Sequence, residues 1–232
     1  IIHMPIKKKI YPIILAGGSG SRLWPLSRKS KPKQYINFFG ADTLFQKTLK
    51  RFSHELFEPP IIITNNQSRF MVKEQLNIIT KKSTKIIIEP APKNTAPASL
   101  AGIIHSNQIS ADPYILISPS DHLIKDEKLF SDLISKLKEK LPDNKILLFG
   151  IKPSDPNTGF GWINAKIEKN KEIYKIKGFV EKPNIDKAKK MFELNSSYWN
   201  TGIFFGKASA FIKQFQMLAP DILSIVSLSY EN

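Results

Sequence analysis

The sequence predicts an α/β protein built on a doubly wound, mostly parallel sheet, with an antiparallel hairpin in its second half. Short apolar runs rich in β-branched residues alternate with longer amphipathic stretches, a pattern typical of βαβ units. The short runs are apolar at successive positions, as expected for parallel strands that are buried on both faces. After Ile151 the pattern changes, and two strand-like segments follow each other directly.

The first half of the chain holds the expected parallel strands and the helices between them. The candidate strands are Pro12–Ala16, Pro60–Thr64, Lys85–Glu89, Tyr114–Ser118 and Ile146–Ile151. Apolar residues recur at helical spacing in Thr43–Phe57, Ser68–Ile79, Thr95–Ile109 and Asp126–Leu141.

The second half predicts the hairpin and a short α/β ending. Phe160–Ile167 and Glu172–Val180 are the two arms, joined by the polar turn Glu168–Lys171. A helix at Asp186–Leu194, a strand at Gly202–Gly206 and a helix at Lys207–Leu218 are expected to follow. Ile222 to Asn232 shows no closing element. We therefore expect a single domain over residues 1–232 that stops before its natural C-terminal boundary.

Composition excludes several classes of protein. A hydrophobic content of 41% excludes intrinsic disorder, and the absence of cysteine excludes a disulfide scaffold, a catalytic thiol and cysteine-based zinc sites. No apolar run approaches the roughly 18 residues of a membrane span. Lys7–Lys9 followed by Ile10–Ala16 superficially imitates a signal peptide. Because that apolar stretch is minimal and contains Pro12, we expect a cytoplasmic protein without a membrane partner.

The formal net charge of +15 raises the question of nucleic-acid binding. Basic residues concentrate between Arg22 and Lys33, with no acidic residue among them. They follow a glycine-rich turn and are not interleaved with aromatic residues. This placement favours a small polyanion such as a nucleotide over a nucleic acid as the ligand. The alternative is a lysine-rich surface that binds no specific ligand.

The glycine-rich turn follows the first predicted strand, where open α/β sheets bind phosphate. The dinucleotide fingerprint fails because Leu23 occupies the place of its third glycine, and the Walker loop has no Gly-Lys-Ser/Thr here. The remaining pattern is Gly-x-Gly-x-Arg, ending at Arg22, with Lys33 further along. Its glycines leave room for a phosphate chain, Arg22 offers a planar fork and Lys33 a movable charge. The alternative is an ordinary glycine-rich turn with surface cations.

The glycine-rich turn is part of a longer motif, Gly17 to Arg28 together with Pro32-Lys33-Gln34. Further blocks follow along the chain: Glu89-Pro90, Asn94–Ala98, Pro119–His122, Thr158–Ile163, Phe179–Pro183 and Trp199–Gly202. In this order the motif and blocks resemble the sugar-1-phosphate nucleotidylyltransferases, and bacterial mannose-1-phosphate guanylyltransferases (GDP-mannose pyrophosphorylases) in particular. The resemblance implies the Rossmann-like nucleotidyltransferase fold.

The resemblance implies nucleotidyl transfer from GTP to mannose-1-phosphate, giving GDP-mannose and pyrophosphate with Mg²⁺. Arg22, Lys33 and Asp121 would be the catalytic residues, with Asp121 as the metal ligand. The alternative for Asp121 is a turn aspartate that caps the helix near Asp126. His122 is expected to be a packing or hydrogen-bonding neighbour. The family's second metal aspartate has no match here, because Asp221 lies in an unrelated context.

The resemblance also assigns the nucleotide-binding residues. They are Leu15, Ala16, Gly17, Gly18, Ser19, Gly20, Ser21, Arg22, Glu89, Pro90, Asn94 and Thr95. The last four would read guanine, since a carboxylate or amide can accept from its N–H edge. Asn94-Thr95 also fits a helix N-cap, and the two roles are compatible.

Sugar-phosphate recognition falls to Gly159, Glu181, Lys182 and Asn200, with an exposed strand end as the alternative for Glu181-Lys182. Phe160, Trp162 and Trp199 would either stack on a sugar or belong to the core. This chain has Phe160 where the family commonly has Tyr, and Thr201 where Ser is common. Both are mild departures, and the first removes one hydroxyl.

Alternatives to guanylyl transfer onto mannose-1-phosphate remain open. The same chemistry could use another sugar-1-phosphate or nucleotide, or the chain could bind a nucleotide-sugar without turnover. GTP and mannose-1-phosphate are the expected small-molecule partners, and nucleic acid is not expected. A homodimer, or association with a separate C-terminal part, is the expected protein partnership.

Overall fold

The computed structural model describes residues 9–18, 25–28, 31–38, 40–80, 83–91, 93–169 and 171–231. The chain forms two compact units. The first takes the chain up to Ile146 and again from Phe204, and the second is Leu147–Ile203. The expectation of a single domain over residues 1–232 stays a prediction, and the two units are described separately below.

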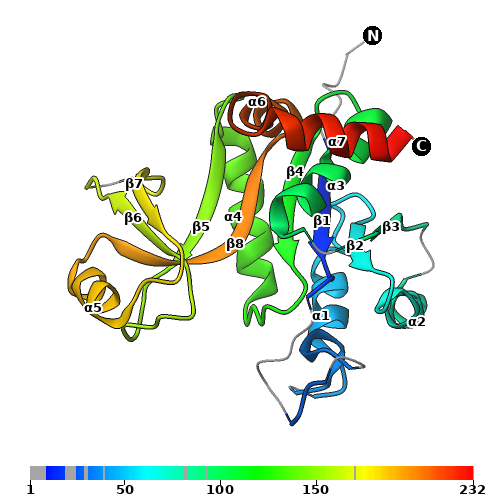
Figure 1. The fold of residues 1–232 in the computed structure, drawn as a ribbon, viewed down its shortest axis with the longest axis horizontal. Coiled ribbons are helices and arrows are strands. Elements are labelled where there is room, and N and C mark those ends of the chain that lie inside the picture. The colour runs from blue at the N-terminus through cyan, green and yellow to red at the C-terminus, as the bar shows by residue number, and fades with distance from the viewer. Residues whose placement is uncertain are drawn as a thin grey trace. The chain divides into compact units, whose positions relative to one another are not determined.

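A parallel sheet forms the centre of the first unit (Figure 1). Its parallel strands lie in the order β3 (Ile86–Glu89), β2 (Ile61–Asn65), β1 (Ile10–Leu15) and β4 (Tyr114–Pro119). The last part of β8 (Ser197–Lys207) pairs antiparallel with β4. In the register of the sheet, the end of β1 pairs with both β2 and β4. The carboxyl ends of these strands therefore meet at one edge.

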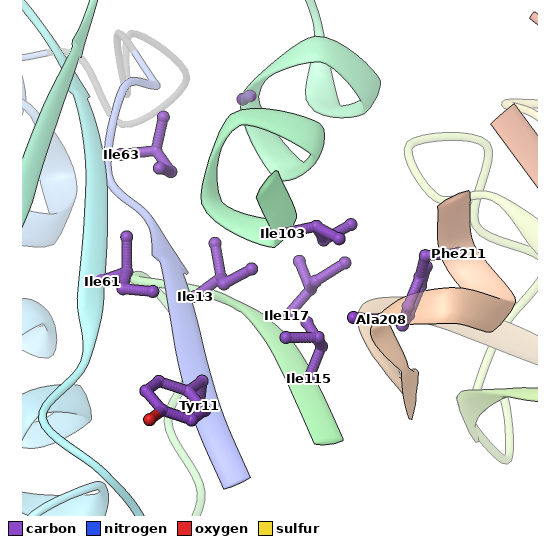
Figure 2. Packing of buried hydrophobic residues seen from close by; sticks show 10 residues of the cluster. Tyr11, Ile13, Ile61, Ile63, Ile103, Ile115, Ile117, Ala208 and Phe211 are labelled. Carbon is purple, nitrogen blue, oxygen red and sulfur yellow. The ribbon is translucent and has the colours of Figure 1, made fainter. Parts of the chain in front are cut away.

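Helices cover both faces of this sheet, which confirms the predicted doubly wound α/β fold. On one face, α3 (Thr95–Ile109) and α6 (Ala208–Leu218) pack against inward-facing isoleucines of the strands (Figure 2). On the other face, the hydroxyl of Tyr114 donates to the carbonyl of Lys138 in α4 (Glu127–Lys140) at 3.3 Å. Both faces of the strands are thus buried, as their continuous apolar composition predicts.

The α3 helix lies close to β1 because its sequence contains Gly102. A Cβ added at Gly102 would lie 2.8 Å from Cγ2 of Ile13, closer than real side chains approach. The close packing aligns α3 with the central strand, and α3 begins at Thr95 beside the strands' carboxyl ends. The remaining helices of this unit are α1 (Leu44–Arg51), α2 (Arg69–Ile79) and α7 (Pro220–Glu231), with a short 3₁₀ turn at Lys33–Tyr35.

The α1 helix is shorter than its predicted range, Thr43–Phe57. A capping box starts it: the amide of Gln46 donates to Thr43 Oγ1, and the Gln46 side chain accepts from the Thr43 amide. It stops at Arg51 because the chain then turns to reach the sheet, where Phe57 bridges to Ile10. The apolar spacing predicted a longer helix because Phe57 is buried. Phe57 lies in the turn after α1, however, and not in the helix itself.

The expectation of no closing element after Ile222 is wrong over the described residues, because Pro220–Glu231 forms α7. Pro220 suits a first helical position and Asp221 interacts favourably with the helix dipole there. The periodicity gave little signal because none of the helix's residues is buried. The hydroxyl of Tyr230 lies 2.5 Å from Nδ1 of His105, linking α7 to α3.

The second unit contains the predicted antiparallel hairpin. Its arms are β6 (Trp162–Lys166) and β7 (Lys175–Val180), and β6 also pairs antiparallel with the start of β8. The predicted strand Gly202–Gly206 is only part of β8, because its earlier residues complete this small sheet. β5 (Ile146–Ile151) pairs with β8, and α5 (Ile185–Glu193) packs through Ala188 and Met191 against Trp162.

Across the two units, none of the helices in the described ranges is long and apolar enough to cross a membrane.

Candidate functional site

The end of β1 is held in place by side chains from neighbouring segments. The Ala16 amide donates to the carbonyl of Ile63 at 2.8 Å, extending the β1–β2 pairing by one residue. The carbonyl of the fully buried Ala16 accepts from the Tyr35 hydroxyl at 2.9 Å, and the Gln34 amide lies at 3.4 Å. The turn that follows β1 therefore starts from a fixed point.

The next two carbonyls of the turn are fixed in the same way. Asn65 Nδ2 donates to the Gly17 carbonyl at 2.8 Å, and Gln34 Nε2 donates to the Gly18 carbonyl at 2.8 Å. Sequence reasoning missed the role of Gln34, Tyr35 and Asn65. The Pro32-Lys33-Gln34 block held the available signal, since Gln34 follows Lys33 directly and is buried.

Part of the predicted phosphate-binding turn falls outside the described residues. Ser19, Gly20, Ser21 and Arg22 all lie there, so their assigned roles stay predictions. Leu15 to Gly18 lie where the sequence predicts, at the carboxyl edge of the sheet.

Glu89 lies directly over the start of the turn. A Cβ added at Gly17 would be 2.9 Å from Oε2 of Glu89, so only glycine leaves this carboxyl undisturbed. Burial raises the pKa of Glu89 above its ordinary value. Gly17 of the turn and Glu89 of the Glu89-Pro90 block thus meet at the ends of β1 and β3, although they belong to different motifs in the sequence.

Asn94 and Thr95 start α3, as the alternative N-cap reading requires. However, the Asn94 side chain makes no capping hydrogen bond, and Asn94 has a φ of 68°. Asparagine tolerates this left-handed region better than most residues. The N-cap alternative therefore explains why Asn94 stands at the start of α3. It does not explain the Asn94 side chain, which makes no capping hydrogen bond.

Lys33 and Asp121 form an ion pair at the same edge of the sheet. Lys33 Nζ lies 2.5 Å from Asp121 Oδ2, and the two side chains are 30% and 24% exposed. The 3₁₀ turn carries Lys33, whereas Asp121 follows β4. The Ser120 amide donates to the carbonyl of Leu15 at 3.1 Å, which ties the Asp121 segment to the turn after β1. Two predicted catalytic residues are thus brought together.

His122 lies next to this pair but is not a second cation. Its Nε2 lies 3.9 Å from Asp121 Oδ1, beyond hydrogen-bond distance. Burial lowers the pKa of His122, an effect that Asp121 opposes and that Arg51 and Lys33 reinforce. The imidazole is therefore neutral at pH 7, as the expectation of a packing neighbour requires.

The donors present fit a magnesium ion that is shared with phosphate. Among the described residues, no group of three or more His, Cys, Asp or Glu side chains could hold a metal alone. Mg²⁺ commonly binds through one or two carboxylates, with waters and substrate phosphates completing its shell. Asp121, partly exposed at the strand ends, can supply one such carboxylate.

In the second unit, Glu181 and Lys182 lie together after β7. Lys182 Nζ donates to Glu181 Oε1 at 2.7 Å, and both side chains are more than half exposed. Lys182 has a φ of 42°, a left-handed conformation that is uncommon for lysine. Strain of this kind in an exposed polar loop is typical of binding sites, although the alternative of an exposed strand end also fits the exposure.

Gly161, which sequence reasoning did not single out, is the glycine that the structure brings beside Glu181. A Cβ at Gly161 would lie 2.8 Å from Glu181 Oε2, and the Asn200 amide donates to the Gly161 carbonyl at 2.7 Å. The predicted Gly159 instead donates its amide to Asn157 Oδ1 at 2.9 Å. Glu181 and Asn200 therefore both contact Gly161, two positions further along the same motif.

The aromatic residues of this unit divide between core and surface. Trp162 is fully buried and its Nε1 donates to the Asn157 carbonyl, which places it in the core. Phe160 is 42% exposed, with its ring centroid 5.0 Å from that of Trp199. Of the stacking candidates, Phe160 presents the accessible face.

Comparison with known proteins shows which family this chain belongs to. The family model described as nucleotidyl transferase matches residues 11–232. The chain is 40% identical over 213 residues to the mannose-1-phosphate guanylyltransferase RfbM of Salmonella typhimurium, and 39% identical over 220 residues to a mannose-1-phosphate guanylyltransferase of Sinorhizobium fredii. These alignments cover 91% and 94% of this chain but 44% and 43% of the relatives, so the chain spans less than half their length.

A solved structure from Thermus thermophilus, described as a mannose-1-phosphate geranyltransferase, matches with a TM-score of 0.84 and 25% identity. The match covers 97% of this chain and 65% of that one. A UDP-glucose pyrophosphorylase complexed with UDP-glucose, at 17% identity and a TM-score of 0.65, shares the fold. The family match over nearly the whole chain shows that this protein belongs to the nucleotidyl transferase family.

Proposed function

We propose that this chain transfers a guanylyl group from GTP to mannose-1-phosphate, with Mg²⁺, releasing GDP-mannose and pyrophosphate. The family supports nucleotidyl transfer, and the names of the relatives support these substrates. The observation that carries the proposal is the Lys33–Asp121 pair at the carboxyl edge of the sheet, tied to the turn after β1. A cation and a carboxylate at this point can serve a triphosphate and its metal ion.

The proposed chemistry needs no general base. A phosphate oxygen of the sugar phosphate is already an anion near pH 7. It forms a bond to the α-phosphorus while the bond from that phosphorus to the bridging oxygen breaks, and pyrophosphate leaves with the electron pair. The barrier arises largely from repulsion between anions, about 4 kcal/mol for two unit charges 4 Å apart at an effective dielectric constant near 20. Neutralisation and in-line positioning are therefore the main catalytic means.

The residues divide this work between them. Lys33 and Arg22 would neutralise the triphosphate, with Arg22 assigned on the motif alone. Asp121 would hold the magnesium ion together with phosphate oxygens, and the bound ion would supply positive charge against the developing pyrophosphate. The Lys33 ammonium, which pairs with Asp121, would contribute a movable positive charge toward phosphate oxygens.

Recognition of the base and the sugar is proposed for separate sets of residues. Glu89, Pro90, Asn94 and Thr95 would read guanine at the start of α3. Glu181, Lys182 and Asn200 would bind the sugar phosphate in the second unit. Gly159 was assigned with them, and the contacts of Gly161 with Glu181 and Asn200 favour the latter glycine.

A pyrophosphate-release assay on this chain with GTP, mannose-1-phosphate and Mg²⁺ tests the proposal. Parallel reactions with ATP or UTP, and with glucose-1-phosphate, test the choice of base and sugar. Release that is fastest with GTP and mannose-1-phosphate supports the proposal. The chain covers less than half the length of these relatives, so binding without catalysis must also be tested. If the chain binds GTP but releases no pyrophosphate, it is a nucleotide-binding protein without turnover. The cytoplasmic location and the protein partners stay predictions.

A further inference from the structure

We propose that Arg51 is a positioning residue for Asp121, acting from helix α1 through the backbone of the segment that follows β4. The inference rests on the proposed function, since Asp121 must present its carboxylate to the metal and to Lys33. Arg51 itself touches neither Lys33 nor the Asp121 carboxylate among the contacts of the described residues. It contacts the next residue, His122.

The Arg51 guanidinium is buried with few partners among the described residues. Its side chain has no exposed surface, and burial lowers its pKa. Its Nη2 donates to the His122 carbonyl at 3.2 Å, and the nearest carboxylate oxygen, on Glu127, is 3.9 Å from Nε. Nε and Nη1 have no hydrogen-bond partner within the described part of the chain.

Such an arrangement is costly to the fold. A buried charge that lacks a close counter-charge destabilises a protein, and an apolar side chain of similar volume is often neutral or stabilising in its place. Packing alone therefore does not explain Arg51 at this position. Among the described residues, its hydrogen bond is to the carbonyl of His122, and this bond points to the role.

Thr48, one turn earlier on α1, contacts the other side of Asp121. Its buried hydroxyl donates to the Leu44 carbonyl at 2.9 Å and lies 3.4 Å from the Ser120 carbonyl. The inner face of α1 thus contacts the carbonyls that flank Asp121 on both sides. With Lys33 on the carboxylate, the helix fixes the direction in which Asp121 faces.

If Arg51 orients Asp121, its removal should weaken metal binding, and the loss of catalysis should follow from that. Groups that orient a metal ligand from behind typically change metal affinity or activity by about 10- to 100-fold when removed. Arg51→Met keeps most of the side-chain volume and removes the donor, so the fold should survive while the Asp121 segment loses its anchor. Arg51→Lys keeps a buried charge but not the planar fork, and should rescue only part of the loss.

The test uses Mn²⁺ as the probe, titrated into the GTP complex and followed by the electron paramagnetic resonance signal of free Mn²⁺. For Arg51→Met we expect an apparent Kd raised about tenfold or more, a kcat lowered to a similar extent and an unchanged KM for GTP. Hydrogen exchange in the metal-free protein should be faster at residues 120–123, with β4 unchanged.

Lys207→Met is the matched control. Lys207 is a buried cation of the same unit whose Nζ lies 2.5 Å from Asp143. It pairs with Tyr114 at the opposite end of β4 from Asp121, so its loss should leave Mn²⁺ affinity unchanged.

A folded Arg51→Met protein with wild-type Mn²⁺ affinity and kcat overturns the inference, as does an equal loss in Lys207→Met. If Arg51→Met does not fold, Arg51→Lys decides, and wild-type values in that variant overturn it. A wild-type chain that binds Mn²⁺ with GTP but releases no pyrophosphate overturns the proposed function alone. In that case the Mn²⁺ affinity of the Arg51 variants still tests the role of Arg51. A wild-type chain that binds no Mn²⁺ with GTP overturns both.

Discussion

Replacing Asp121 by Asn separates its contribution to stability from its contribution to chemistry. The change removes the ion pair with Lys33, whose atoms lie 2.5 Å apart in a partly exposed setting. Two unit charges this close attract by about 7 kcal/mol at an effective dielectric constant of about 20. Solvent screening and side-chain entropy reduce such a pair to on the order of 1 kcal/mol of folding free energy. For a chain of this size that corresponds to a fall in Tm of about 2–4 °C.

The predicted loss of activity is much larger. A metal ligand contributes several kcal/mol of charge stabilisation in the transition state, and each 1.4 kcal/mol is about tenfold in rate, so kcat should fall at least ~100-fold. Calorimetry measures the first effect, and pyrophosphate release across a magnesium titration measures the second. Asp143→Asn removes an ion pair of the same length, with Lys207, and should lower Tm without changing the magnesium dependence. A magnesium titration of Asp121→Asn that matches wild type refutes the reasoning.

Four further changes test other parts of the site. Arg22→Ala should reduce kcat by about 100-fold or more with the fold intact, because it removes a cation from the triphosphate, and near-normal kcat would reject its role. GTP should raise Tm more than ATP, and equal shifts would remove the guanine assignment. Gly161→Ala should displace the Glu181 carboxyl and the exposed Phe179 ring, which lie equally close to the added Cβ. It should raise the KM for sugar phosphate about tenfold with little change in Tm, so an unchanged KM would count against the Glu181 contact. Since burial raises the pKa of Glu89, its ionisation opposes folding as pH rises through the folded pKa. Glu89→Gln should therefore be at least as stable as wild type at pH 7, and urea denaturation should show that any advantage disappears below about pH 4, where both states are protonated.

The alternation of strands and helices predicted the fold because it reports burial directly. Continuous isoleucine runs such as Ile61–Ile63 are buried on both faces of a parallel sheet, which leaves few other arrangements open. Where burial is slight, the signal was weak. The α7 helix was missed because none of its residues is buried, and the first part of β8 was missed because Trp199 and Asn200 do not form an apolar run.

The site was predictable where a motif contains its residues. Lys33 was assigned from its place after the glycine-rich turn and Asp121 from the family resemblance, and the two side chains meet in the structure. Arg51 was not, because in the sequence it is one more cation on an amphipathic helix, and only the tertiary fold buries it against the His122 carbonyl. Gly161 was missed because two glycines lie close together in one motif, and only the position of Glu181 distinguishes them.

A crystal structure of this chain with a non-hydrolysable GTP analogue and Mn²⁺ shows directly whether the turn after β1 binds the triphosphate. We predict that the phosphates lie against this turn, within reach of Lys33, and that anomalous scattering places the metal at the Asp121 carboxylate. Phosphates bound elsewhere contradict this prediction, for instance on the lysines of the pocket lined by Lys47, Lys50 and Lys125.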